Sequence, residues 1–304
     1  MFDTVDDVQN ALAELDYIAE RSLATAIYLS LKLGKPLFLE GEAGVGKTEI
    51  AKTLATMLDT DLIRLQCYEG LDASQALYEW NYAAQMLHLR MMEASGSSRE
   101  TMQEELFSTQ FLQARPLLRA VQAGAEGRRV VLLIDELDRS DEEFEAFLLE
   151  ILSDFQVTIP ELGTVRAEVT PAVVVTSNRT REIHDALKRR CLYTWIHYPS
   201  FEKELRIIRA RTPQVEAQLA RQITAFMQEL REMDLFKAPG VAETLDWTAA
   251  LIALGQHELT LEVVNDTLGV VLKYQDDIDM LQDETIQMLL ERARIEGNRQ
   301  GSTI

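Results

Sequence analysis

The sequence predicts an α/β domain, in which helices cover both faces of a parallel sheet, followed by a smaller all-α lid domain. Three observations support this fold class. Residues 41–48 fill the pattern G-x-x-x-x-G-K-[ST] between a strand pattern and a helix pattern. Strand and helix patterns then alternate as far as residue 199, and only helical periodicity follows. We therefore place the domains at residues 1–199 and 200–304.

The glycine-rich octet is predicted to bind phosphate. It reads Gly41-Glu42-Ala43-Gly44-Val45-Gly46-Lys47-Thr48. Glycines let the backbone curl so that several N–H groups point at one anion, and the helix that follows adds the positive end of its dipole. In such a loop Lys47 can reach the β- and γ-phosphates of a nucleotide, and Thr48 can hold Mg²⁺. The alternative is an ordinary glycine-rich turn between a strand and a helix.

Composition is ordinary for a globular protein, since 47% of the 304 residues are apolar and 26% are charged. No apolar run approaches the ~20 residues of a membrane span, and the N-terminus is acidic, so we expect a cytoplasmic protein without a membrane span. Cys67 and Cys191 lie far apart, which favours two reduced thiols. The net charge of −20 counts against tight nonspecific binding to nucleic acid, although a local basic pore is conceivable.

The first half of the chain alternates between helix and strand patterns. Residues 4–33 have the apolar stripe of one or two amphipathic helices. Residues 61–66 have a strand pattern, and residues 73–90 are expected to be helical. A polar stretch at 95–100 suggests an exposed tip, after which helical character resumes through residues 107–117.

The second half completes the sheet and then turns helical. The β-branched run at 129–134 suits a strand buried on both faces, and a helix is expected at 141–152. Residues 155–159 and 164–169 suggest a hairpin, and 172–176 is the next central strand. The lid helices are predicted at residues 202–210, 213–233, 243–254, 261–271 and 280–295.

Two adjacent acids, Asp135 and Glu136, follow the strand pattern at 129–134. In an open α/β sheet, the phosphate-binding loop lies at that same edge. We expect Asp135 to orient Mg²⁺ and its waters, and Glu136 to polarise the attacking water. The alternative is a helix cap and a solvated turn, which Asp138 or Ser140 could serve equally well.

Asn178 and a pair of arginines complete the candidate site. Asn178 follows the strand at 172–176, where a neutral amide could hold the attacking water and the γ-phosphate, although Asn is also common in turns. Arg189 and Arg190 end a short helix pattern at 183–190. They could simply complement the helix dipole. Either could also stabilise the transition-state charge on a nucleotide held by a neighbouring subunit.

This set of motifs, in this order and followed by a helical lid, resembles that of an AAA+ ATPase, a P-loop NTPase. The segments concerned are residues 41–48, Ile134-Asp135-Glu136, Thr176-Ser177-Asn178 and residues 186–191. More narrowly, the chain resembles the MoxR family and, within it, the CoxD-like branch. The run at residues 177–187 carries much of this narrower likeness.

The resemblance implies a hexameric ring with ATP and Mg²⁺ at each subunit interface and an arginine finger supplied by the neighbouring subunit. Alignment with the usual Leu-x-x-Arg-Phe ending makes Arg190 the finger and Arg189 its runner-up, while Cys191 stands where Phe is common. It also implies that an insertion in the second helix, within residues 70–90, and the hairpin at 155–169 line a central pore.

Two segments qualify this resemblance. Many relatives place a sensor arginine at the start of a lid helix, where this chain has Gly240-Val241-Ala242-Glu243-Thr244-Leu245-Asp246-Trp247. Another residue would therefore have to report the nucleotide state. In the insertion, Tyr78, Trp80 and Tyr82 could line the pore, but such an aromatic stripe is more often part of a core.

The function implied by the resemblance is a Mg-dependent ATPase that remodels a protein client. A MoxR-type member acts with a partner that carries a von Willebrand A domain, and a CoxD-like member matures a metalloenzyme such as a molybdenum-containing carbon monoxide dehydrogenase. A nucleotide-regulated assembly scaffold and a nucleic-acid motor are the alternatives. The motor would need basic loops, whereas residues 95–100 and 161–166 are mixed in charge.

Overall fold

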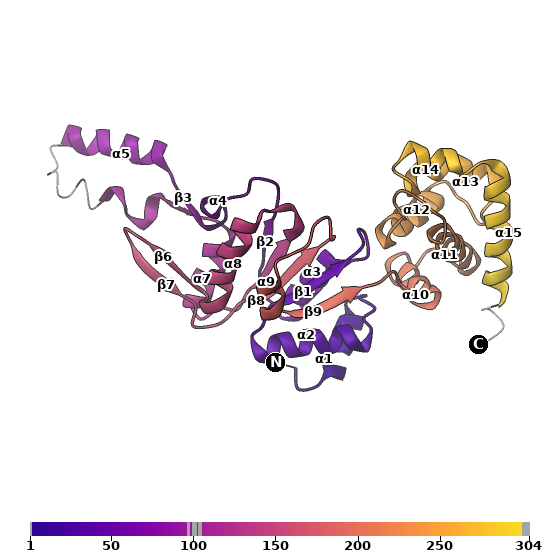
Figure 1. Cartoon of the computed structure of the whole chain (residues 1–304), viewed down its shortest axis with the longest axis horizontal. Coiled ribbons are helices and arrows are strands. Elements are labelled where there is room, and N and C mark those ends of the chain that lie inside the picture. The colour runs from indigo at the N-terminus through magenta and orange to yellow at the C-terminus, as the bar shows by residue number, and fades with distance from the viewer. Residues whose placement is uncertain (1, 96–97, 99–101, 103–104, 300–304) are drawn as a thin grey trace. The chain divides into compact units, whose positions relative to one another are not determined.

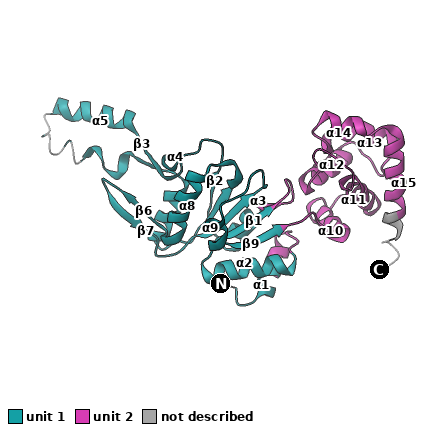
Figure 2. Ribbon diagram, viewed as in Figure 1, with its two compact units in different colours: residues 1–9, 20–40, 48–195 teal, residues 10–19, 41–47, 196–304 magenta. Residues whose placement is uncertain are grey.

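The computed structural model describes residues 2–95, 98, 102 and 105–299, shown in Figure 1. Most of the predicted tip at residues 95–100 therefore lies outside the described residues. The chain forms two compact units, coloured separately in Figure 2. Unit 1 comprises residues 1–9, 20–40 and 48–195, and unit 2 comprises residues 10–19, 41–47 and 196–304. The predicted boundary between residues 199 and 200 stays a prediction.

Unit 1 is built on the predicted parallel sheet of five strands, so the fold class is confirmed. The strand order is β2-β5-β8-β1-β9, in which neighbours in space are not neighbours in sequence. The strands are β1 (Leu37–Gly41), β2 (Leu62–Gln66), β5 (Val131–Asp135), β8 (Ala172–Ser177) and β9 (Leu192–Ile196). The register places Gln66 opposite Asp135, and Glu40 opposite Ser177. The carboxyl ends of these strands therefore meet at one edge of the sheet.

Both faces of the sheet are buried, as the apolar strand patterns predict. On one face, Phe38, Leu132 and Val173 pack in a single core with residues of the helices α7 (Pro116–Ala125) and α8 (Glu142–Asp154). Strand side chains alternate between faces, so the equally buried intervening residues point to the other face; they are Leu37, Leu39, Val131, Leu133 and Val174. The remaining helices of the strand-helix alternation are α1 (Val5–Glu14), α2 (Arg21–Leu33), α3 (Lys47–Met57) and α9 (Asp185–Arg190).

The predicted helix at residues 73–90 is wrong, because a short strand interrupts it. The segment forms α4 (Ala73–Leu77), β3 (Tyr78–Trp80) and α5 (Tyr82–Ser95), and β3 pairs antiparallel with β4 (Leu112–Ala114). Aromatic residues two apart suit a strand, in which alternate side chains share a face. Trp80 is buried with Phe111, which belongs to the 3-10 turn η1 (Thr109–Phe111), whereas Tyr82 is 66% exposed. Trp80 is therefore part of a core.

The predicted hairpin is confirmed as β6 (Gln156–Ile159) and β7 (Gly163–Arg166), which pair antiparallel. Val157 and Ile159 of β6 join Trp80 and Phe111 in one apolar cluster. Figure 1 shows the hairpin and the β3–α5 segment on the same side of unit 1, beyond α7 and α8. The insertion and the hairpin thus form one substructure.

The described residues of unit 2 from residue 196 onward form mainly helices, as predicted, with a shifted start for the last helix and one additional short helix, α14. The helices are α10 (Phe201–Arg211), α11 (Ala217–Arg231), α12 (Val241–Ala253), α13 (Leu261–Val271), α14 (Gln275–Met280) and α15 (Asp283–Arg299). The helix predicted at 280–295 begins instead at Asp283, where Asp283 and Glu284 favour a helix N-terminus. Within the described residues, no helix is both long and apolar enough to cross a membrane.

Candidate nucleotide-binding site

The glycine-rich loop leaves β1 and enters α3, as the octet pattern predicts. Gly44 and Gly46 have φ angles of +74° and +94°, a region that residues with a Cβ rarely adopt. These bends turn the loop back on itself between strand and helix. The conformation is therefore specified by glycine, and it is the kind of backbone that presents N–H groups to a phosphate.

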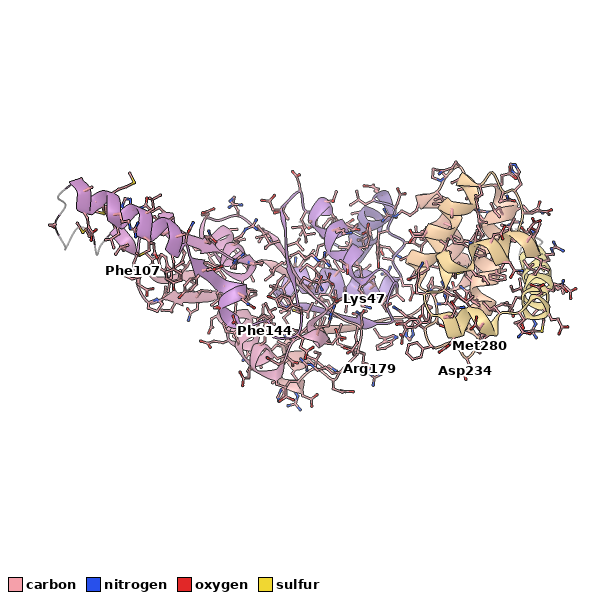
Figure 3. All side chains as sticks on the ribbon, turned by 90° about the horizontal axis from the view of Figure 1, so that it is seen from above. Lys47, Phe107, Phe144, Arg179, Asp234 and Met280 are labelled. Carbon is pink, nitrogen blue, oxygen red and sulfur yellow. The ribbon has the colours of Figure 1, made fainter. Side chains whose placement is uncertain are left out.

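Lys47, labelled in Figure 3, is only 6% exposed. Its ammonium group donates hydrogen bonds to the backbone oxygens of Gly41 (2.7 Å) and Glu42 (2.6 Å). These carbonyls hold the lysine side chain along its own loop. Exchanging them for phosphate oxygens would keep the ammonium group hydrogen-bonded, so Lys47 can serve an anionic ligand.

Thr48 and Asp135 lie together at the carboxyl edge of the sheet. The Thr48 hydroxyl donates a hydrogen bond of 3.1 Å to Oδ1 of Asp135, which is 2% exposed. Mg²⁺ prefers hard oxygen ligands and usually takes one or two from protein, with phosphate and water supplying the others. A hydroxyl and a carboxylate oxygen this close fit that preference. Thr48 and Asp135 would therefore hold Mg²⁺.

Thr176 of β8 links the two predicted acids. Its hydroxyl donates a hydrogen bond of 2.5 Å to Oδ1 of Asp135 and accepts one of 2.9 Å from the N–H of Glu136. Glu136 itself has φ +54°, so its backbone is left-handed at the turn out of β5. The acid that caps α8 is Asp141, whose carboxylate accepts the N–H of Phe144 at 2.8 Å. The acid pair is thus not the cap of that helix.

Two residues of β2 contact the acid pair, although the sequence did not predict them to be part of the site. Arg64 donates to Oδ2 of Asp135 from Nε (3.0 Å) and Nη2 (2.6 Å), and it also donates to the Gln66 amide oxygen. The Gln66 amide then donates 3.0 Å to Oε2 of Glu136, which Arg139 also contacts at 3.2 Å. The alternation of polar residues in β2 was visible in the sequence, but its place beside β5 was not.

Burial also raises the pKa of the thiol of Cys67, the residue after β2. Its backbone N–H donates 2.9 Å to the Asp135 carbonyl. Burial, and then the negative charge of Asp135, raise the pKa of the Cys67 thiol to about 12. Burial likewise raises the pKa of Cys191 to about 12. Both thiols therefore stay protonated at neutral pH, and both cysteines are free.

Asn178 follows β8 at the same edge and is held through its backbone. The Asn178 N–H donates 3.1 Å to the carboxylate of Asp138, a residue that is itself 3% exposed. In the sequence, Asp138 was only an alternative cap. In the structure, it joins the turn after the acid pair to the segment after β8.

Arg189 and Arg190 lie in the last turn of α9 and are both exposed. They line a cavity of about 610 Å³ together with Lys35, Arg166 and residues of the α8 C-terminus, and Arg190 donates to the Ser153 hydroxyl. The structure does not group these arginines with Asp135, Glu136 or Thr48. Asp154 and Glu168 also line this cavity, so its charges are mixed with an excess of basic groups.

Within unit 2, the phosphate-binding loop meets the first turn of α12. A Cβ added to Gly240 would lie 2.7 Å from the Ala43 oxygen and 2.7 Å from the Gly44 Cα, so only glycine fits there. The Ala242 N–H donates 3.2 Å to the Gly44 oxygen. In the segment 240–247, which has no arginine, backbone atoms of Gly240 and Ala242 contact the loop.

Comparison with protein families identifies the chain. The family described as AAA domain (dynein-related subfamily) matches residues 36–191. That range is just over half of the chain and runs from the start of β1 to the end of α9. This chain belongs to that AAA family. The match includes the glycine-rich loop, the acid pair, Asn178 and the two arginines.

Several relatives share the AAA region. An uncharacterized protein of Staphylococcus epidermidis is 24% identical over 269 residues, which cover 86% of this chain and 90% of that protein. The uncharacterized protein YehL of Escherichia coli is 26% identical over 214 residues, which cover 67% of this chain and 52% of YehL. Among solved structures, the RuvB Holliday junction branch migration motor of Thermotoga maritima aligns with a TM-score of 0.46 and 17% identity, over 85% of this chain and 70% of that one.

Proposed function

We propose that this AAA protein binds ATP with Mg²⁺ and hydrolyses it. The observation that carries the proposal is the 3.1 Å contact between Thr48 and Asp135 at the carboxyl edge of the sheet. It brings together the predicted metal-binding hydroxyl and the predicted metal-binding carboxylate, which are 87 residues apart in the sequence. Glu136 is the residue that would polarise the attacking water, and Asn178 would help to orient it.

We further propose that the cycle drives remodelling of a protein client, as in MoxR-type ATPases. The support is the resemblance of the motifs, above all of residues 177–187 to the CoxD-like branch. On this proposal the chain works as a homo-oligomeric ring, with six subunits expected, and with a von Willebrand A domain partner. Its client is a metalloenzyme, and a molybdenum-containing carbon monoxide dehydrogenase is the specific candidate.

ATP binding and turnover by the full chain test the first proposal. Lys47→Ala should abolish ATP binding because the ammonium group that neutralises the phosphates is lost. Lys52→Ala is the matched control, since Lys52 is an exposed lysine of the same helix that pairs with Glu49. Equal ATP affinity in the parent chain and in Lys47→Ala would contradict the phosphate-binding role of the loop.

The Glu136→Gln variant tests both turnover and the client. It should retain bound ATP while losing hydrolysis, because an amide cannot polarise the attacking water as a carboxylate does. Expressed in the native host, this ATP-bound variant should co-purify with the client, and a molybdenum hydroxylase among the bound proteins would support the specific candidate. Unchanged client maturation in Glu136→Gln would favour the assembly scaffold, and salt-dependent DNA binding would favour the nucleic-acid motor.

A further inference from the structure

A buried carboxylate, Asp138, collects three hydrogen bonds from the segment that carries Asn178. Its Oδ1 accepts the Asn178 N–H at 3.1 Å, and its Oδ2 accepts the Thr180 N–H at 2.9 Å and the Thr180 hydroxyl at 2.7 Å. Asp138 is 3% exposed. A buried carboxylate needs donors on both oxygens. Here every one of these donors comes from residues 178–180.

The two N–H groups converge because the residue between them has an unusual backbone. Arg179, labelled in Figure 3, has φ +59°, a left-handed conformation that is unfavourable for a residue with a Cβ. Its own N–H donates 3.0 Å to the Ser177 hydroxyl. This conformation persists only where the surroundings hold it, and the Asp138 carboxylate supplies the bonds on either side of it.

Asp138 is rigidly connected to the acid pair. It lies in the 3-10 turn Leu137–Arg139, which begins directly after Glu136. The Arg139 N–H donates 3.0 Å to the Glu136 oxygen, and the Ser140 N–H donates 3.0 Å to the Leu137 oxygen. Asp138 therefore links the position of Asn178 to that of the acid pair.

We propose that Asp138 is a positioning residue, which fixes Asn178 relative to the acid pair during ATP hydrolysis. This inference rests on the proposed ATPase function. Asp138 acts through the backbone of residues 178–180, and its role is to keep the Asn178 amide where the attacking water must be held. Precise placement of such groups contributes strongly to rate, since a misplacement of about 1 Å can cost about 100-fold.

The far end of the segment is held independently, so the segment should not unfold when Asp138 is changed. Arg181 donates to the Ser140 oxygen from Nε (2.8 Å) and Nη2 (2.6 Å) and pairs with the buried carboxylate of Glu145. Glu145 in turn accepts the His184 N–H at 2.7 Å. These contacts anchor residues 181–184 to α8 and to the turn before it.

The test variant is Asp138→Asn, which keeps the shape of the side chain. An amide offers one acceptor oxygen and turns an NH₂ group toward the other donors, so at least one hydrogen bond to residues 178–180 is lost. We expect kcat for ATP to fall about 10- to 100-fold while KM stays within about twofold. Asp141→Asn is the matched control, because it makes the same change three residues on and Asn caps a helix as well as Asp.

A second variant separates positioning from folding. Thr180→Val removes the hydroxyl bond and keeps the backbone bond, so its loss of kcat should be smaller than that of Asp138→Asn. The double variant should lose little more than Asp138→Asn alone, because both changes act on one contact. ATP affinity should match the parent value closely, and a melting temperature that stays well above the assay temperature shows that each variant is folded during turnover.

A parent-like kcat in Asp138→Asn overturns the positioning role, and so does a raised KM with unchanged kcat. An equal loss in Asp141→Asn also overturns it, because the effect would then follow from charge alone. If the parent and Asp141→Asn bind ATP but neither hydrolyses it, the proposed ATPase function fails, and the role of Asp138 fails with it.

Discussion

The amide of Gln66 donates a 3.0 Å hydrogen bond to the carboxylate of Glu136, across the neighbouring strands β2 and β5. Arg139 contacts the same carboxylate oxygen at 3.2 Å. Both contacts are made to Oε2, one of the two carboxylate oxygens, and they restrain the orientation of the Glu136 side chain. We expect Glu136 to turn more freely toward the attacking water when these bonds are weakened.

Gln66→Ala should therefore raise basal ATP turnover. A hydrogen bond to a charged group contributes about 1.5–3 kcal/mol, and part of that energy holds Glu136 away from its task, so we expect an increase of up to about tenfold. Steady-state phosphate release measures it. Gln113→Ala, an exposed glutamine of β4, is the control. A large decrease in Gln66→Ala would show that Gln66 holds Glu136 in its working position instead.

Arg190→Ala should lower turnover on the order of 10³-fold or more while ATP affinity is nearly unchanged. Arg189→Ala is the comparison, because both side chains line the same cavity on α9. The reverse pattern would make Arg189 the finger. Mixing Arg190→Ala subunits with Glu136→Gln subunits should restore part of the turnover, since some interfaces then combine the intact Glu136 of an Arg190→Ala subunit with the intact Arg190 of a Glu136→Gln subunit. No recovery would contradict supply from a neighbouring subunit.

The two cysteines make stability depend on alkaline pH. Burial raises the pKa of both Cys67 and Cys191 to about 12, whereas an unfolded thiol titrates near 8.5. Between these values the folded chain binds more protons than the unfolded chain. Its free energy of unfolding should therefore fall as pH rises from about 9 toward about 12.

Comparison with Cys67→Ala isolates the contribution of the Cys67 thiol to the pH dependence of the free energy of unfolding. The parent and the variant share the other groups that titrate at high pH. The slope of unfolding free energy against pH should be smaller in the variant. A thiol reagent at pH 8 should also label neither cysteine until urea unfolds the chain. Rapid labelling of Cys67 under native conditions would show that its thiol is accessible.

A buried ion pair stabilises unit 2. Arg231 and Glu204 are 5% and 0% exposed at their side chains, and Thr244 and Gln228 complete the hydrogen bonds of the carboxylate. Glu204→Gln leaves the buried guanidinium without its counter-charge, so it should cost about 3–5 kcal/mol. Urea unfolding followed by Trp247 fluorescence, with Trp80 and Trp195 replaced by Phe, measures the change.

The exposed pair between Arg292 and Glu229 is the matched control for that ion pair. Its side chains are 57% and 30% exposed, so Arg292→Ala should cost at most about 1 kcal/mol. Replacing both buried partners by apolar residues should restore much of the stability, because no charge is then left uncompensated. A loss in Glu204→Gln no larger than that in Arg292→Ala would contradict this account.

Local patterns predicted most of the fold. The buried strands and the helices of the AAA domain have strong apolar periodicity, and the glycine-rich octet fixes the turn between β1 and α3. The contact between Thr48 and Asp135 follows from these patterns, because both residues lie at the carboxyl edge of a parallel sheet.

Tertiary neighbours account for what the sequence could not show. Strand order places β2 beside β5, so the contacts of Arg64 and Gln66 with the acid pair depend on a pairing between distant segments. Residues 78–80 have a composition that favours a helix, so the sequence predicted no strand there. Their strand pairs with β4, which is more than thirty residues away in the sequence. Asp138 was visible as a capping candidate, but its partners come from residues 178–180.

The hydroxyl of Thr176 has a single proton, and two groups depend on where that proton points. It accepts the amide hydrogen of Glu136 and donates to Asp135, which leaves one permitted rotation about its C–O bond. The Glu136 N–H, the Thr176 hydroxyl and the Asp135 carboxylate thus form a chain of two hydrogen bonds that both point toward the negative charge of Asp135. A methyl group in place of that hydroxyl would deprive the Glu136 N–H of its acceptor and remove one of the donors that Asp135 shares with Thr48 and Arg64, so one oxygen atom ties the backbone of Glu136 to the side chain of Asp135.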